Sequence, residues 1–262
     1  MTFFQTLYSG SSGNSTLICD RNNKVLVDIG MNYKTTAAAL DSIGIKPEEI
    51  SALVITHEHI DHVAGLRVFL RRHKIPVYAS KGTLSYLLDK DLMPEKSDII
   101  SLKSGETVVI DGMEFFGFAT SHDSAECFGY RFSLSNSKSI SILTDSGCVS
   151  CEIMDILRAS NFIAIESNYD ENMLRYGDYP YFLKRRIFSD KGHLSNTECS
   201  RIVAQLTCES GDKKFCLMHL SKNNNAPEIA RMACLSALEN FGVECSGLEV
   251  APRSRPGAVV EL

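Results

Sequence analysis

Residues 51–66, SALVITHEHIDHVAGL, constrain the fold of this chain most tightly. An apolar, β-branched run ends there, and His57, His59, Asp61 and His62 follow within six positions. In an extended segment His57 and His59 point the same way, because side chains alternate between the two faces of a strand. Asp61 and His62 come where the chain turns into a helix, so they can face a second point nearby. Imidazole and carboxylate groups are good ligands for Zn, Mn or Fe, so this segment predicts two ligands for each of two metal ions.

Other buried runs also end in side chains that bind metals. The residues at these ends are His57, His122, Asp145, Glu166 and His219. Sites in α/β folds collect outside the carboxyl ends of strands, so we expect these side chains to share one site. His122, Asp145 and His219 are the candidates for the remaining ligands. The histidine of the RRHK segment, His73, is instead expected at the solvated end of a surface helix.

Strand-like and helix-like segments alternate along the whole chain. Strands are expected at 3–8, 15–19, 24–30, 52–56, 76–80, 106–110, 113–120, 127–134, 139–144, 162–166 and 214–219. Helices are expected at 33–44, 62–73, 81–90, 151–160, 196–207 and 226–242. No Pro/Gly-rich linker or repeat divides the 262 residues. We therefore expect one α/β domain over residues 1–262, with mixed sheets covered by helices.

Composition limits the class of protein. The net charge of −5 argues against broad, non-specific binding of nucleic acid, although it leaves room for a local basic patch. No apolar run approaches the roughly 20 residues of a membrane helix. The segment MTFFQTLYSGSSGNS has no basic stretch before a long apolar core, so no signal peptide is expected. Nine scattered cysteines, an odd number, indicate reduced thiols in a cytoplasmic protein.

Several motifs resemble those of one known superfamily. THEHIDHVAGL (56–66) resembles the signature of the metallo-β-lactamase fold superfamily, and SHD (121–123), TDSG (144–147) and MHLS (218–221) resemble its later motifs in the expected order. Longer stretches narrow the resemblance to the bacterial YycJ/WalJ family of nucleases. These stretches are SGSSGNS (9–15), ESNYD (166–170), MLRYGDYPYFLKRRIFSDKGHLSN (173–196) and HLSKNNN (219–225).

The resemblance implies a fold, a metal site and an activity. The fold is a metallo-β-lactamase αββα sandwich, two mixed β-sheets flanked by helices, and the cofactors are two divalent metal ions. Carried over residue by residue, the first metal is held by His57, His59 and His122, the second by Asp61, His62 and His219, and Asp145 bridges them. The family is associated with 5′-to-3′ exonuclease activity on double-stranded DNA. A histidine often follows ESN in that family, and this chain has Tyr169 there, which leaves the role of that position open.

The metal site suggests a mechanism for phosphodiester hydrolysis. Two cations roughly 3.5–4 Å apart lower the pKa of a bridging water and clamp a phosphate, and the resulting hydroxide attacks phosphorus in line. Asp61 is expected to orient this hydroxide. His193 resembles the catalytic histidine of related fold members, placed to contact the phosphate or protonate the leaving oxygen; otherwise it is a plain loop histidine. Asn14 either contacts the site or a phosphate, or only forms its turn. Ser221 and residues 223–225 are candidates for hydrogen bonds behind the ligands.

Basic and aromatic side chains are interleaved just before His193. The basic ones are Arg175, Lys184, Arg185, Arg186 and Lys191, and the aromatic ones are Tyr176, Tyr179, Tyr181 and Phe182. Cations together with aromatic faces suit a nucleic-acid backbone and a frayed terminal base. Because a charge run is often only a solvated face, this segment is a candidate substrate surface and not an established one.

Three other interpretations remain open at this stage. The chain is alternatively a small-molecule hydrolase of the same fold, such as a thioesterase, lactonase or cyclic-nucleotide phosphodiesterase; residues 173–196 argue against that. A di-iron redox protein usually has glutamate where this chain has His59. A catalytically dead scaffold conflicts with the presence of every expected ligand. The metal itself is also open, because histidines favour Zn whereas the carboxylates also suit Mn or Fe.

Overall fold

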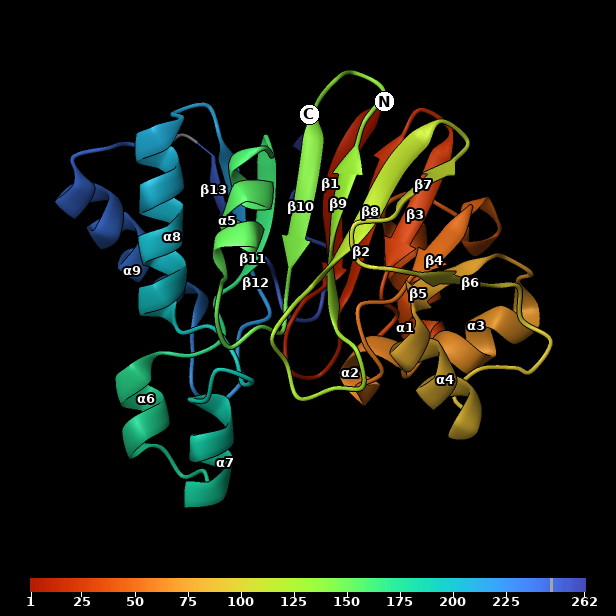
Figure 1. Cartoon of the computed structure of the whole chain (residues 1–262), viewed down its shortest axis with the longest axis horizontal. Helices are drawn as coiled ribbons and strands as arrows, with labels where there is room; N and C mark the ends of the chain where they lie inside the picture. The colour runs from red at the N-terminus through yellow and green to blue at the C-terminus, as the bar shows by residue number, and fades with distance from the viewer. Residues whose placement is uncertain (246) are drawn as a thin grey trace.

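Two seven-stranded sheets form the centre of the molecule in the computed structural model, which describes residues 1–245 and 247–262 (Figure 1). The first sheet runs in the spatial order β14 (Val260–Glu261), β1 (Thr2–Tyr8), β2 (Ser15–Asp20), β3 (Asn23–Val27), β4 (Ala52–Val54), β5 (Val77–Ser80) and β6 (Ile99–Leu102). The second runs in the order β13 (Leu248–Val250), β12 (Lys214–Met218), β11 (Phe162–Glu166), β10 (Ser139–Leu143), β9 (Phe128–Ser133), β8 (Met113–Ala119) and β7 (Thr107–Ile110).

Each sheet combines an antiparallel half with a parallel half. Strands β3 to β6 pair in parallel in the first sheet, and strands β10 to β13 do so in the second. Parallel neighbours end at the same edge of a sheet, so the residues that follow β3 and β4, or β10, β11 and β12, are brought together. This is the topological reason that strand-end residues far apart in sequence gather in one place.

Helices cover the outer faces of both sheets and complete the expected αββα order (Figure 1). The first sheet is covered by α1 (Tyr33–Ser42), α3 (Leu66–Arg72) and α4 (Lys81–Asp89), with the short α2 (Ile60–Val63) and a 3₁₀ turn, η1 (Pro47–Glu49). The second sheet is covered by α5 (Cys151–Arg158), α8 (Asn196–Glu209) and α9 (Pro227–Phe241). Among the described residues, no helix is long and apolar enough to span a membrane.

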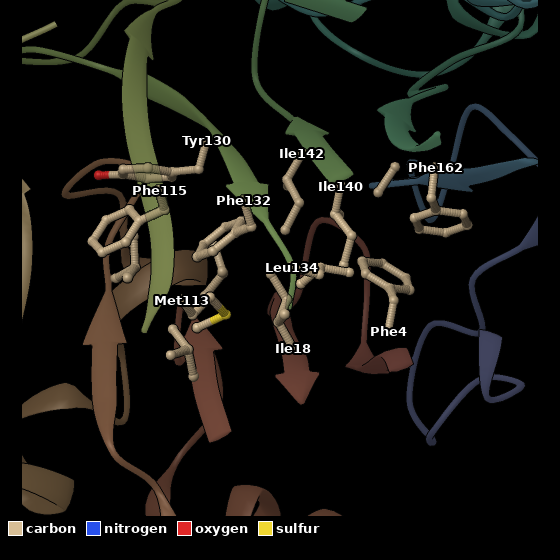
Figure 2. Close-up of a cluster of buried hydrophobic side chains, with 14 of the residues drawn as sticks. Phe4, Ile18, Met113, Phe115, Tyr130, Phe132, Leu134, Ile140, Ile142 and Phe162 are labelled. Carbon is tan, nitrogen blue, oxygen red and sulfur yellow. The ribbon is translucent and has the colours of Figure 1, made fainter. Parts of the chain in front are cut away.

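The main core lies between the two sheets. Figure 2 shows Phe4 and Ile18 of the first sheet directed toward Phe132, Ile140 and other apolar side chains of the second. The rings of Phe4 and Phe162 lie 4.5 Å apart between centroids. Strands that are buried on both faces explain why their sequences read as nearly continuous apolar runs instead of alternating ones.

Two short helices project from one end of the sandwich, apart from the face-covering helices (Figure 1). They are α6 (Glu171–Tyr176) and α7 (Tyr181–Ile187), and we call residues 169–191 the α6–α7 lobe. The lobe has its own small core, made of Tyr169, Leu174 and Ile187 with Tyr179 and Leu183 packed against it. Tyr169 packs edge-on against Phe188 and is 5% exposed, which makes it a structural anchor of the lobe.

The structure corrects several expectations from the sequence. The single helix expected at 62–73 is wrong, because the structure has two helices there, α2 and α3. Between them the backbone N–H of Gly65 donates to Ile29 O at 2.9 Å, and a Cβ on Gly65 would lie 2.2 Å from Met31 O. The strands β6, β13 and β14 and the helices α6 and α7 were not expected, since they have only two to seven residues. His73 ends α3 as expected but is not solvated: it is 9% exposed and its Nε2 lies 3.0 Å from the Tyr33 hydroxyl.

Candidate metal centre

Strand ends from both sheets meet in one polar cluster beneath the hydrophobic core. β4 leads into His57, β10 into Asp145 and β12 into His219, while β11 ends in Glu166. The remaining members lie at the start of α2 and in loops, at His59, Asp61, His62, His122 and His193. The structure thus brings together every residue that the sequence predicted as a metal ligand.

Three members of this region hold left-handed backbone conformations that non-glycine residues rarely adopt. They are Asp28, Asp145 and His219, with φ values of 62°, 52° and 57°. Asp28 and His219 directly follow β3 and β12, and Asp145 comes two residues after the end of β10. Such conformations cost about 1–3 kcal/mol each and persist only where surrounding contacts impose them, so the strand ends are bent at the expense of stability.

Close packing around the HxHxDH segment fixes its path. Gly30 has the tightest contact, because a Cβ there would lie 1.7 Å from the carbonyl oxygen of Asp61. The backbone N–H of Asn14 donates to the same Asp61 oxygen at 2.8 Å. The loop after β3 and the turn at 9–15 therefore clamp the backbone that carries the ligands.

His57, His59 and His122 form one candidate metal-binding group. Each offers a nitrogen, and these atoms lie within 4.8 Å of one another. His122 Nε2 is 3.2 Å from His59 Nδ1, and His57 Nε2 is buried without a hydrogen-bond partner among the described residues. A buried nitrogen without a partner costs free energy unless a ligand satisfies it, so this group fits a cation.

Asp61, His62 and His219 form a second group of the same kind, with atoms again within 4.8 Å. Asp145 lies between the groups, with Oδ2 3.1 Å from His62 Nε2 and Oδ1 3.7 Å from His122 Nε2. Its Oδ2 is buried and has no hydrogen-bond partner among the described side chains. The carboxylate of Asp145 is 2% exposed and contacts both groups, the arrangement that a shared ligand requires.

In four histidines of the cluster, Nδ1 lies within hydrogen-bonding distance of a protein oxygen. The partners are Thr56 Oγ1 for His57 (3.1 Å), Asp28 Oδ2 for His62 (2.8 Å), Gly192 O for His122 (3.0 Å) and Glu166 Oε1 for His219 (2.8 Å). A proton held at Nδ1 leaves Nε2 as the atom that can bind a cation. Metal-binding histidines typically have such a partner behind the ring, so the donor set fits divalent metals.

Glu166 has a role that the sequence did not reveal. Its carboxylate is 0% exposed, and Oε1 accepts from both His193 Nδ1 (2.7 Å) and His219 Nδ1 (2.8 Å). Oε2 accepts from the backbone amides of Ser146 (3.1 Å) and Leu194 (3.2 Å). Glu166 therefore sets the orientation of two histidines at once. Asp28 does the same for His62 and Thr56. The sequence signal for Glu166 was its place at a strand end, whereas Asp28 gave none, because the strand was expected to continue to residue 30.

Burial and neighbouring charges shift the pKa values of the cluster in different directions. Burial, with the neighbouring His62, holds the pKa of His57 well below its usual range. Burial alone would also lower the pKa of His219, but Asp145, Asp61 and Glu166 raise it to about 10. Against burial, His219 and His62 hold the pKa of Asp145 well below its usual range. The buried carboxylates are thus stabilised by nearby positive charge. Protons on the histidines supply this charge when no metal is bound, and metal cations would supply it after displacing those protons.

A pocket of about 390 Å³ opens over the cluster and extends to the α6–α7 lobe. Its walls include Asp61, Asp145 and His193 from the cluster and Tyr179, Leu183 and Arg186 from the lobe. The Arg186 guanidinium is paired with the carboxylate of Asp123, which follows His122 in the chain. The pocket therefore joins the candidate metal centre to the basic segment.

The other sequence-predicted substrate residues lie in different places. Asn14 is 3% exposed, and its side-chain amide is engaged by Gly10 N (2.9 Å) and Gly10 O (3.1 Å), so it holds the turn. Its Nδ2 also lies 3.2 Å from His62 Nε2, the nitrogen on the metal side of that ring. Arg175 and Arg185 are exposed on the lobe outside the pocket, and Lys184 Nζ donates to Arg175 O at 2.9 Å. Ser221 lines the pocket, whereas Asn223 donates to the Tyr179 hydroxyl at 3.3 Å.

Comparisons with known proteins agree with this geometry. The sequence model of the metallo-beta-lactamase superfamily matches residues 8–132. Exodeoxyribonuclease YycJ of Bacillus anthracis is 35% identical over 241 residues, 91% of this chain and 90% of that protein. Exodeoxyribonuclease WalJ of Streptococcus pneumoniae serotype 2 is 36% identical over 237 residues, 90% of this chain and 87% of that protein. Zn²⁺-bound PqqB of Methylobacterium extorquens shares the fold, with a TM-score of 0.74 over 99% of this chain and 100% of that one at 16% identity.

Proposed function

The chain belongs to the metallo-β-lactamase superfamily and, within it, to the family of the YycJ and WalJ exodeoxyribonucleases, and from this membership we propose that it shortens double-stranded DNA from the 5′ end. The observation that carries the proposal is the donor set around Asp145, in which four buried imidazoles have Nδ1 engaged and Nε2 directed toward neighbouring ligand atoms. This set suits metal-assisted hydrolysis of a phosphodiester.

Two divalent cations are proposed to occupy the centre. His57, His59 and His122 would hold the first, Asp61, His62 and His219 would hold the second, and Asp145 would contact both. When bound, the cations lower the pKa of a shared water and neutralise charge on the phosphate oxygens. The predominance of nitrogen donors favours Zn²⁺, while three-ligand groups with carboxylates also accept Mn²⁺ or Fe²⁺.

Asp61 and His193 are proposed as the residues that handle protons. Asp61 keeps a partly exposed carboxylate at the pocket, where it would accept a hydrogen bond from the attacking water and orient it. Glu166 fixes the proton of His193 at Nδ1. To act as the acid, Nε2 must carry a second proton, so His193 in its imidazolium form would donate from Nε2 to the leaving oxygen of the scissile bond.

The basic segment is proposed to bind the DNA backbone. Arg186 lines the pocket beside the candidate metal centre, so it is the cation best placed for a phosphate next to the scissile bond. Arg175, Lys184 and Arg185 lie farther out on the same lobe, where they would contact more distant phosphates.

A nuclease time course tests this proposal. Purified protein would be given end-labelled duplex DNA, the matching RNA and a chromogenic phosphodiester, each with Mn²⁺ or Zn²⁺, with Asp61→Ala as the control. We expect the DNA to shorten progressively from its 5′ end with the unaltered protein and to remain intact with the variant. Cleavage of the small diester alone would reject the nuclease and indicate a small-molecule hydrolase of the same fold.

A further inference from the structure

Four large aromatic side chains of the α6–α7 lobe are exposed, and one of them, Phe188, is only 40% exposed and packs against Tyr169. Tyr176, Tyr181 and Phe182 are 80%, 76% and 73% exposed, whereas the neighbouring Leu174 and Ile187 form the core of the lobe. These three rings therefore contribute nothing to the packing of the lobe itself. An exposed aromatic ring beside an active-site pocket is instead a typical contact for a ligand.

Phe182 is an exposed ring on α7, the helix that lines one side of the pocket. Leu183, Arg186 and Ile187 line the pocket, so one side of α7 faces it. Phe182 precedes Arg186 by four residues, the spacing that makes side chains neighbours on a helix surface. Tyr181 and Arg185 have the same spacing, and the Arg185 guanidinium lies 6.0 Å from the centre of the Tyr181 ring. Two pairs, each with one ring and one guanidinium, thus lie next to each other on α7, and Arg186 of one pair lines the pocket.

The charge of α7 identifies the kind of partner. The helix carries Lys184, Arg185 and Arg186 and no acidic residue, in a chain with a net charge of −5. A second copy of this chain would bring an equally basic helix against it and would be repelled. Alternating rings and cations match a single nucleic-acid strand, because bases stack on rings while phosphates pair with guanidinium groups.

We propose that Phe182 stacks on the terminal base of the DNA strand whose first phosphodiester enters the pocket. Arg186 holds the phosphate next to this base, and Tyr181 with Arg185 receives the following part of the strand. The assignment rests on the proposed nuclease function and adds a specificity to it. A stacked terminal base must leave its pair, so duplex ends with a mismatched terminal pair are better substrates than ends closed by G·C pairs.

Duplexes with 2-aminopurine at the 5′ end test the stacking directly. Phosphorothioate groups replace the first linkages to slow cleavage. The fluorescence of the base is followed while the duplex is titrated with the unaltered protein, with Phe182→Ala or with Phe182→Trp. Stacking quenches this base, so we expect quenching with the unaltered protein and Phe182→Trp and its loss with Phe182→Ala. Phe241→Ala removes a ring that is 47% exposed on α9 and serves as the matched control, with full quenching expected.

Kinetics on cleavable duplexes give the second readout. Loss of one base stack lowers affinity by about tenfold, so Phe182→Ala is expected to raise KM by that factor and to remove the preference for mismatched ends. Unchanged quenching and an unchanged preference in Phe182→Ala would overturn the inference. A dimer in the unaltered protein that Phe182→Ala dissociates would overturn it too, by assigning the ring to self-association. Quenching without any cleavage of ordinary DNA would instead reject the proposed function and leave the stacking intact.

Discussion

The candidate metal centre and the α6–α7 lobe share one pocket but are built in opposite ways. Glu166 and His57 are 0% exposed in the centre, whereas Tyr176 and Phe182 of the lobe are 80% and 73% exposed. The centre stands on strand ends of two large sheets, and the lobe rests on a core of a few side chains. The candidate metal ligands are therefore held in a buried framework, while the groups proposed to bind the substrate are exposed and supported by few contacts.

The two regions are nevertheless joined through the segment that follows α7. Gly192 O accepts from His122 Nδ1, and Asp123 N donates to Lys191 O at 3.1 Å. His193 follows directly and is bound to Glu166. These hydrogen bonds connect the end of the lobe to two histidines of the centre.

The largest effect is expected from Asp145→Ala, which removes the carboxylate between the two metal groups. Removing one electrostatic stabiliser in an active site costs about 10²–10³-fold in rate, and loss of a group that contacts both cations is expected to cost more. Metal analysis of the purified variant and a DNA time course measure this. A variant that keeps two metals per chain and near-normal turnover would show that Asp145 is not shared.

His193→Ala is expected to separate chemistry from metal binding. The ring lines the pocket and its Nδ1 is bound to Glu166. It clusters with Asp145, Glu166 and His219 but lies outside the two proposed metal groups, so we expect the metals to be retained. Loss of a general acid costs about 10²–10⁴-fold in rate. Turnover and metal content are measured on the same sample, with His73→Ala as a histidine control far from the cluster. Full turnover in His193→Ala would reject its assignment.

Glu166→Gln is expected to weaken both metal affinity and turnover by about 10–100-fold, the usual effect of altering a group behind a metal ligand. The amide that replaces one oxygen would present N–H groups to the Ser146 and Leu194 amides, which are also donors. Competition with a chelator measures the affinity. Glu114→Gln changes an exposed glutamate and serves as the control. Normal metal affinity in Glu166→Gln would show that the histidines need no orienting partner.

Leu174→Ala is expected to give the smallest effect, a local loosening of the lobe. Leu174 and Leu157 are both 0% exposed, but Leu174 belongs to the small lobe core and Leu157 to the large core between β-sheet and helices. Leu157→Ala should lower the free energy of unfolding by about 2–5 kcal/mol. Leu174→Ala should instead speed hydrogen exchange in α6 and α7, with metal content unchanged. An equal fall in Tm for both variants would show that the lobe unfolds with the sandwich.

Much of the fold was predictable because its signals are local. Buried parallel strands read as short apolar runs, so 52–56, 139–144 and 162–166 correspond to β4, β10 and β11. Weak or short elements gave no such signal: β6 is exposed along most of its length, and α6 and α7 have only six and seven residues. His73 shows the same limit, since nothing near it in sequence indicates that Tyr33 covers it.

The candidate ligands, their order along the chain and the family of the chain could be predicted from the sequence alone. The folded structure was needed to show which groups lie behind those ligands, that Asn14 supports a turn, and that Phe182 is exposed while Tyr169 is buried. The difference follows from how far apart the interacting residues lie along the sequence. A ligand pattern and a strand period lie within a few neighbouring residues, whereas Glu166 meets His193 and His219 only after β11 and β12 pair and the lobe folds back across their ends.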